Sequence, residues 1–224
     1  MAPVDKPCCL GTVKQGELKG KNVELGPLTT YIIGSEKEGG SAVLCIPDIF
    51  GFSIPNTRLQ NGFTVESAFA NLLHTISLNE MLRRLFADQL AQQGFFVLLP
   101  DIFHGDSWDN SKELAPNGDW SVFTEWRMKH PQGPQMLQLD RLLTDMHQQY
   151  KPKTVSCIGF CWGGHHSTAL AGTDKVSAAI VAHGSFVTKE LVQAAHQPIQ
   201  FLFADNVRHS VPSCHAAAGT ADLK

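Results

Sequence analysis

A single cysteine flanked by glycines constrains the fold more than any other part of the sequence. Cys161 lies in the segment GFCWGG, residues 159–164, directly after the apolar run 154–158 and before the helix-compatible run 165–171. A G-x-C-x-G pattern between a strand and a helix is typical of a sharp turn that holds its central residue in a strained backbone conformation. The glycines leave room for the strand and the helix to approach each other. The sequence therefore predicts Cys161 at a strand-to-helix turn.

Short apolar runs alternate with helix-like stretches along the chain. The runs expected to form strands are residues 42–46, 95–99, 155–158, 178–182 and 201–203. Two segments carry apolar side chains at helical spacing, residues 85–93 and residues 136–150. Apolar strands that alternate with helices indicate a sheet buried on both faces. We expect an α/β fold with a doubly wound, mostly parallel sheet.

Length and charge limit the classes of partner. The 224 residues carry a formal net charge of -3, so the basic excess of a nucleic-acid-binding protein is missing. The sequence has neither a signal-like start nor an apolar run of about 18 residues, which predicts a cytoplasmic protein without a membrane partner. One domain over residues 1–224 is expected. We expect the partner to be a small molecule.

The cysteine pattern indicates free thiols. The chain has six cysteines without paired C-x-x-C spacing, so neither a zinc site nor a disulfide scaffold is expected.

At the start of a helix, the Cys161 thiolate would be stabilised by the helix dipole and by free backbone N–H groups. The N–H of Trp162 could then bind a developing oxyanion. The alternative is that Cys161 is a small core residue and the glycines form only a tight turn.

Three further segments carry a family resemblance. The sequence DIFG at residues 48–51, PDIF at residues 100–103 and PCC at residues 7–9, together with the GFCWGG segment, resemble the dienelactone hydrolase family, notably its fungal members. The resemblance covers most of residues 7–206. It implies an α/β-hydrolase-like fold and hydrolysis of a lactone or carboxylic ester by a cysteine nucleophile, without a metal or an organic cofactor.

The resemblance also implies roles for two residues after the first apolar run. Asp48 occupies the place of an acidic residue that helps to control the protonation of the nucleophile, and Ile49 would offer the second oxyanion N–H. The alternative for Asp48 is a turn residue that caps the loop after a strand. Asp101 is more simply explained as a residue that bonds loop amides.

The chain departs from the family pattern in two places. Residues 59–84 form an insertion, which could be a lid over the site or a retained intron. Val207 stands where the family has its acid, and the tail 207–224 lacks the His-Gly-Phe motif that carries the base. Chain order permits a triad of Cys161, Asp205 and His209, although His209 follows too soon to be brought over the nucleophile easily. The fold is therefore expected to lack its last strand and helix.

Structural roles are expected for the remaining histidines, and alternatives to hydrolase activity remain open. His165 and His166 are expected in the first turn of the helix after Cys161, and His183 at the end of the run 178–182. The alternatives to a hydrolase are an impaired or inactive family member and a small-molecule-binding module. A histidine within hydrogen-bond reach of Cys161 would discriminate between them.

Overall fold

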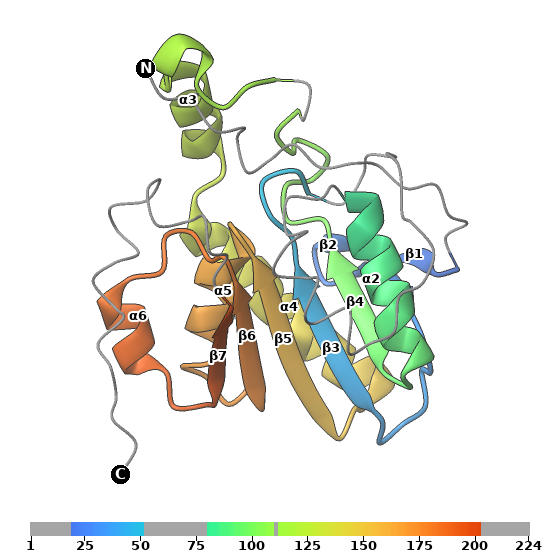
Figure 1. Cartoon of the computed structure of the whole chain (residues 1–224). Coiled ribbons are helices and arrows are strands. Elements are labelled where there is room, and N and C mark those ends of the chain that lie inside the picture. Colours follow the sequence, from blue (N-terminus) through green and yellow to red (C-terminus); the bar gives the residue numbers. More distant parts are fainter. Residues whose placement is uncertain (1–18, 52–79, 110–111, 203–224) are drawn as a thin grey trace.

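The computed structural model describes residues 19–51, 80–109 and 112–202, which form a seven-stranded sheet with helices on both faces (Figure 1). The strands are β1 (Lys21–Leu25), β2 (Leu28–Ile33), β3 (Ser41–Ile46), β4 (Phe96–Pro100), β5 (Thr154–Phe160), β6 (Ala178–Ala182) and β7 (Ile199–Leu202). The helices are α2 (Glu80–Gln92), α3 (Ser121–Lys129), α4 (Gln132–Tyr150), α5 (Gly163–Leu170) and α6 (Lys189–Ala194).

The strand order is β1-β2-β4-β3-β5-β6-β7. Five strands, β3 to β7, run parallel to one another, whereas β1 and β2 pair antiparallel and β2 pairs antiparallel with β4. The predicted α/β fold with a doubly wound, mostly parallel sheet is therefore confirmed. Because parallel strands share a direction, the loops after β3, β4, β5 and β6 meet at one edge of the sheet, where sites form in such folds.

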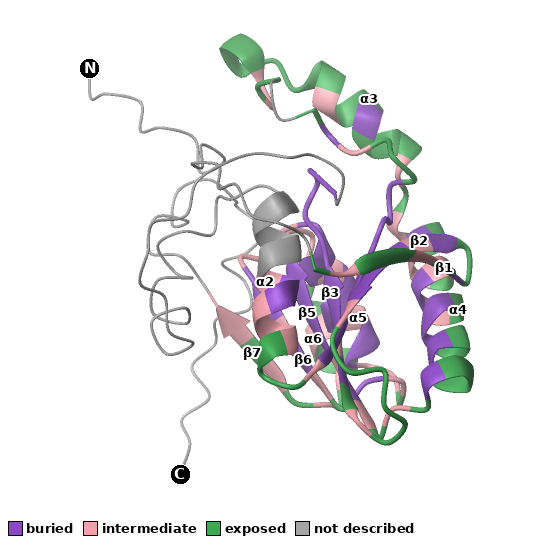
Figure 2. Cartoon of the chain, turned by 90° about the vertical axis from the view of Figure 1, so that its right-hand side faces the viewer, coloured by how far each residue is buried: buried purple, intermediate pink, exposed green. Residues whose placement is uncertain are grey.

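The two faces of the sheet are buried in separate clusters. Leu44 and Ile46 of β3 pack with α4 and α5 on one face, while Cys45 between them packs with α2 on the other. This alternation follows from the period of two along a strand. Figure 2 shows the buried strands between α2 and α4. The predicted apolar face of residues 136–150 is confirmed, since Leu139, Leu142, Leu143 and Met146 of α4 are fully buried.

The hairpin of β1 and β2 and the helices α3 and α6 were not expected from the sequence. β1 and β2 form a hairpin around Gly26, whose φ of 59° is one that glycine readily adopts. β1 is largely exposed, so it has no apolar run to reveal it. Helix α3 lies within the segment 104–134, which is rich in Asp, Asn, Gly, Pro and Trp, a composition that predicts a long surface excursion. It projects from the body of the domain beyond the sheet and buries only Trp126 (Figure 1).

Several predictions concern residues outside the described ranges. Helix α2 begins at Glu80, so the last residues of the predicted insertion 59–84 are helical, and the rest of the insertion lies outside the described residues. Asp205, His209, the tail 207–224 and the expected loss of a final strand and helix also lie outside them. Among the described helices, none is long and apolar enough to span a membrane.

Candidate active site

Cys161 lies between β5 and α5, as the glycine pattern predicts. β5 ends at Phe160 and α5 begins at Gly163. The φ of Cys161 is 48°, a left-handed conformation that costs free energy for any residue with a Cβ. The cysteine is partly exposed, whereas Cys157, in the strand before it, is fully buried. Strained backbone and partial exposure together distinguish Cys161 from a core cysteine.

The glycines around Cys161 bring backbones into contact. A Cβ on Gly159 would overlap the backbone of Gly163, and a Cβ on Gly163 would overlap the Ile46 carbonyl at the end of β3. The same Cβ would lie 2.9 Å from the carbonyl oxygen of Pro47. Glycine is therefore required for the helix start to lie against both β5 and the loop after β3.

Ser185, which the sequence did not single out, lies beside the cysteine. Its Oγ is 3.3 Å from Cys161 Sγ. The N–H of Ser185 donates to the Cys161 carbonyl at 2.7 Å, and the N–H of Cys161 donates to the Ala182 carbonyl at 3.0 Å. Ser185 follows an expected strand by three residues, at the edge of the sheet where sites form. This position could have indicated it as a site residue from the sequence.

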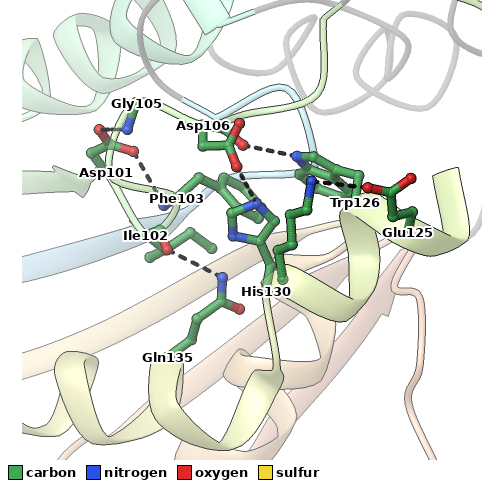
Figure 3. Close-up of polar contacts among 10 residues, drawn as sticks. Asp101, Ile102, Phe103, Gly105, Asp106, Glu125, Trp126, His130 and Gln135 are labelled. Carbon is green, nitrogen blue, oxygen red and sulfur yellow. Dashed lines mark hydrogen bonds and ion pairs between the residues drawn. The ribbon is translucent and has the colours of Figure 1, made fainter. Parts of the chain in front are cut away.

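Trp162 is fully buried and anchors the turn from behind. Its indole Nε1 donates to Gln135 Oε1 at 2.8 Å, and Gln135 Nε2 donates to the Ile102 carbonyl at 3.1 Å. Figure 3 shows Gln135 reaching Ile102 from α4. The ring of Trp162 also lies within 5.9 Å of Phe103 and within 5.4 Å of Phe186, between ring centroids. These contacts fix the residue whose N–H is the expected oxyanion donor.

The loop after β3 supports a structural role for Asp48. Its carboxylate oxygen Oδ1 accepts a hydrogen bond from the Phe50 N–H at 2.8 Å, the arrangement of a turn residue. Asp48 and Ile49 are both buried, with 5% of each residue exposed. The Ile49 carbonyl accepts from the Trp108 N–H at 2.7 Å. The turn alternative for Asp48 thus has direct support, and a role in controlling the nucleophile stays a prediction.

Asp101 bonds loop amides, as its simpler explanation requires. Its two carboxylate oxygens accept from the N–H groups of Phe103 and Gly105, at 3.2 and 2.7 Å (Figure 3). Burial raises the pKa of this carboxyl, and the amide hydrogen bonds oppose that rise. The residue shapes the loop after β4.

The histidines of α5 have structural partners. His165 Nδ1 lies 3.0 Å from the Phe186 carbonyl, and His166 Nδ1 lies 3.3 Å from the Trp162 carbonyl. His166 is fully buried, and burial lowers its pKa to about 3, so it stays neutral. His183 follows β6 with a φ of 42° and donates its backbone N–H to the Leu202 carbonyl.

A histidine–aspartate pair in the loop after β4 was also missed from the sequence. His130 Nε2 lies 3.1 Å from Asp106 Oδ2, and the imidazole packs on the rings of Phe103 and Trp126 (Figure 3). Burial lowers the pKa of His130, against the attraction of Asp106. A pocket of about 300 Å³ beside this pair is lined by α3 and the adjoining loop. Among the described residues, no cluster of His, Cys, Asp and Glu suits a metal ion.

Thiol reactivity should separate Cys161 from the cysteines of the sheet. Burial raises the pKa of Cys157 to about 12, whereas Cys161 is partly exposed and adjoins the α5 N-terminus. At neutral pH we expect iodoacetamide to label Cys161 at least tenfold faster than Cys157 or Cys45, measured by peptide mass spectrometry. Equal rates for all three in the folded protein would contradict this assignment.

Sequence comparisons place the chain among known hydrolases. The family model for the dienelactone hydrolase family matches residues 76–217. The carboxymethylenebutenolidase homolog of Homo sapiens is 28% identical over 205 residues, which cover 89% of this chain and 69% of the human protein. The homolog of Mus musculus is 28% identical over 203 residues with the same coverage.

Solved structures share the fold. The crystal structure of a dienelactone hydrolase candidate from Klebsiella pneumoniae superposes with a TM-score of 0.55 at 14% identity, covering 90% of this chain and 91% of that one. A dienelactone hydrolase-like promiscuous phosphotriesterase from metagenomic libraries gives a TM-score of 0.53 at 17% identity, covering 83% and 68%. The family model matches more than half of the residues, and the fold agrees with it. The chain therefore belongs to the dienelactone hydrolase family.

Proposed function

We propose that this hydrolase cleaves carboxylic esters or lactones through a thiolate at Cys161. The observation that carries the proposal is the left-handed, partly exposed cysteine at the junction of β5 and α5. A nucleophile must be reachable by a substrate, and the helix N-terminus favours its negative charge. The family membership of the chain supports the same class of reaction.

The reaction would proceed through an acyl-enzyme. The Cys161 sulfur attacks the carbonyl carbon, the N–H groups of Trp162 and Ile49 bind the oxyanion, and the alcohol leaves with a proton. Water then attacks the thioester, which releases the acid and returns the thiol. A lactone gives a hydroxy acid by the same steps. These steps need neither a metal nor an organic cofactor, because the sulfur and the backbone N–H groups supply the chemistry.

The acid and base of the second step are proposed from chain order. Asp205 and His209 follow Cys161 in the order nucleophile, acid, base that α/β hydrolases use. Asp48, in the loop that touches the turn, would act on the protonation of the thiol. The partner is a small ester or lactone in this proposal, and the site of action is cytoplasmic, without nucleic acid or membrane.

Covalent trapping tests the proposal. After brief mixing with p-nitrophenyl acetate and an acid quench, we expect one acetyl group per chain, carried by the peptide that contains Cys161. The matched control is Cys157, four residues earlier in β5, which should stay unmodified because it is buried. Acetylation confined to other residues would refute the assignment of the nucleophile.

A further inference from the structure

We propose that the Ser185 hydroxyl is a catalytic hydrogen-bond donor to the Cys161 thiolate, held in place by a contact between Gly164 and Gly184. The inference rests on the proposed function, because it adds a second group to the same nucleophile. Ser185 Oγ lies 3.3 Å from Cys161 Sγ, within the range for a hydrogen bond to sulfur. Sγ is the reacting atom of the proposed mechanism.

A hydroxyl suits this position in both protonation states of the sulfur. It can accept a hydrogen bond from the thiol and can donate one to the thiolate after ionisation. A hydrogen bond to a charged group is stronger than one between neutral groups, so the contact stabilises the thiolate more than the thiol. The pair is partly buried, which limits the ability of water to replace a lost hydroxyl.

Backbone hydrogen bonds tie the Ser185 loop to the cysteine. The N–H of Ser185 donates to the Cys161 carbonyl at 2.7 Å, so the backbones of the two residues are joined as well as their side chains. On the other side, Cys161 donates its N–H to Ala182, the last residue of β6. These two bonds fix the distance between the residues independently of the side-chain contact.

The loop is also held in an unusual backbone conformation. His183 and Phe186, on either side of Ser185, have φ values of 42° and 57°. Such values cost free energy and persist only when the surrounding structure holds them. Phe186 is held by its ring contact with Trp162 and by the contact of its carbonyl oxygen with His165 Nδ1, 3.0 Å away.

Two glycines allow the loop to reach the helix start. A Cβ on Gly164 would lie 2.5 Å from the Cα of Gly184, closer than atoms of this kind can pack. A Cβ on Gly184 would lie 2.5 Å from Cγ1 of Val181. A side chain at position 164 would push the loop away from α5, and one at position 184 would collide with the side chain of Val181 in β6. The close contact of the two backbones therefore sets where Ser185 lies relative to the sulfur.

The pH profile of thiol reactivity tests the proposal. The wild-type chain and the variants Ser185→Ala, Ser185→Thr and Ser185→Val would be reacted with 2,2′-dithiodipyridine from pH 5 to 10. The rate at Cys161 would be followed by peptide mass spectrometry after an acid quench. Threonine and valine have nearly the same shape and differ in the hydroxyl, so their comparison isolates that group. Urea unfolding checks that each variant is folded.

We expect loss of the hydroxyl to raise the midpoint of the profile, which reports the pKa of the Cys161 thiol, by about one pH unit. A shift of this size corresponds to the free energy of one hydrogen bond to a charged group. A thiolate of higher basicity is more nucleophilic, so the plateau rate at high pH should rise about threefold while the rate at low pH falls about threefold. Threonine should keep the wild-type midpoint, and valine should follow alanine. A change of packing alone would not produce two rate changes of opposite sign.

Equal midpoints in the wild type and Ser185→Ala would overturn the proposal, and so would a threonine variant that titrates like valine. If the alanine variant did not fold, the threonine and valine pair would decide by the same criterion. The profile needs no substrate, so it is separate from the acetyl-trapping experiment. A shifted midpoint without acetylation of Cys161 would sustain the Ser185 contact and reject the hydrolytic mechanism.

Discussion

Replacement of Cys161 by alanine is expected to remove the burst of p-nitrophenol that the wild-type chain should release from p-nitrophenyl acetate. The burst should amount to about one equivalent per chain, because a thiolate can be acylated without an assisting base. In the variant the amplitude should fall to zero. Loss of the nucleophile in a complete catalytic triad lowers kcat by up to roughly a millionfold, and what remains comes from binding and the oxyanion hole.

After the burst, turnover in the wild-type chain should be slow. Water is a poor nucleophile towards the thioester and needs a base. The two histidines of α5 lie with Nδ1 against backbone carbonyls. His209 follows Asp205 by only four residues, which leaves little chain to carry the base over the sulfur. Fast steady-state hydrolysis that disappears with Cys161 would show that a histidine does reach the acyl-enzyme.

The matched control for this variant is Cys157→Ala. It removes a thiol from the strand that precedes Cys161, and that thiol is buried and remains protonated, so the burst should persist at full amplitude. Stopped-flow absorbance at 400 nm would measure both amplitudes. A full burst from Cys161→Ala would assign the acyl group to another residue.

The sheet could be predicted from the sequence because its strands are buried on both faces. A parallel strand in the interior consists almost entirely of apolar residues, so β3, β4, β5 and β6 are visible as short apolar runs. β1 could not be found in this way, since it lies at the edge of the sheet and most of its side chains are exposed. β2 was missed as well, although most of it is buried, because two threonines interrupt its apolar run, whereas β7 at the opposite edge was predicted.

The position of the cysteine was predictable for a local reason, and its neighbours were not. The conformation of Cys161 depends on glycines within three residues, so the pattern is contained in one segment. Ser185 reaches the sulfur through a loop 24 residues later in the chain, and its position depends on a contact between Gly164 and Gly184 that no local pattern reveals. His130 likewise meets Asp106 from 24 residues away.

Replacement of Gly163 by alanine should be among the most destabilising single substitutions in this chain. The added Cβ would overlap the carbonyl of Ile46 and lie 2.9 Å from the carbonyl oxygen of Pro47. Both are backbone atoms, one at the end of β3 and one in the loop after it, so a rotamer change cannot relieve the overlap. The start of α5 would have to move away from β3, and the anchored position of Trp162 would be lost with it.

We expect a loss of about 4 kcal/mol or more in the free energy of unfolding, the range that marks a backbone clash in a packed region. Since small domains have a total stability of about 5 to 15 kcal/mol, much of the variant could be unfolded at 37 °C. Urea titration followed by circular dichroism would measure the change. Tryptophan fluorescence would report on the buried indole of Trp162 in the same samples.

Gly133→Ala is the matched control for Gly163→Ala. Gly133 also lies in the first turn of a helix, α4, and a Cβ there would meet nothing within 4 Å. Alanine favours a helix over glycine by up to about 1 kcal/mol, so this variant should be as stable as the wild type or slightly more stable. If Gly163→Ala unfolded at the same urea concentration as Gly133→Ala, the close contact between α5 and the end of β3 would be wrong. The position assigned to Cys161 would then lose its structural basis, because the same contact holds the strand-to-helix turn in place.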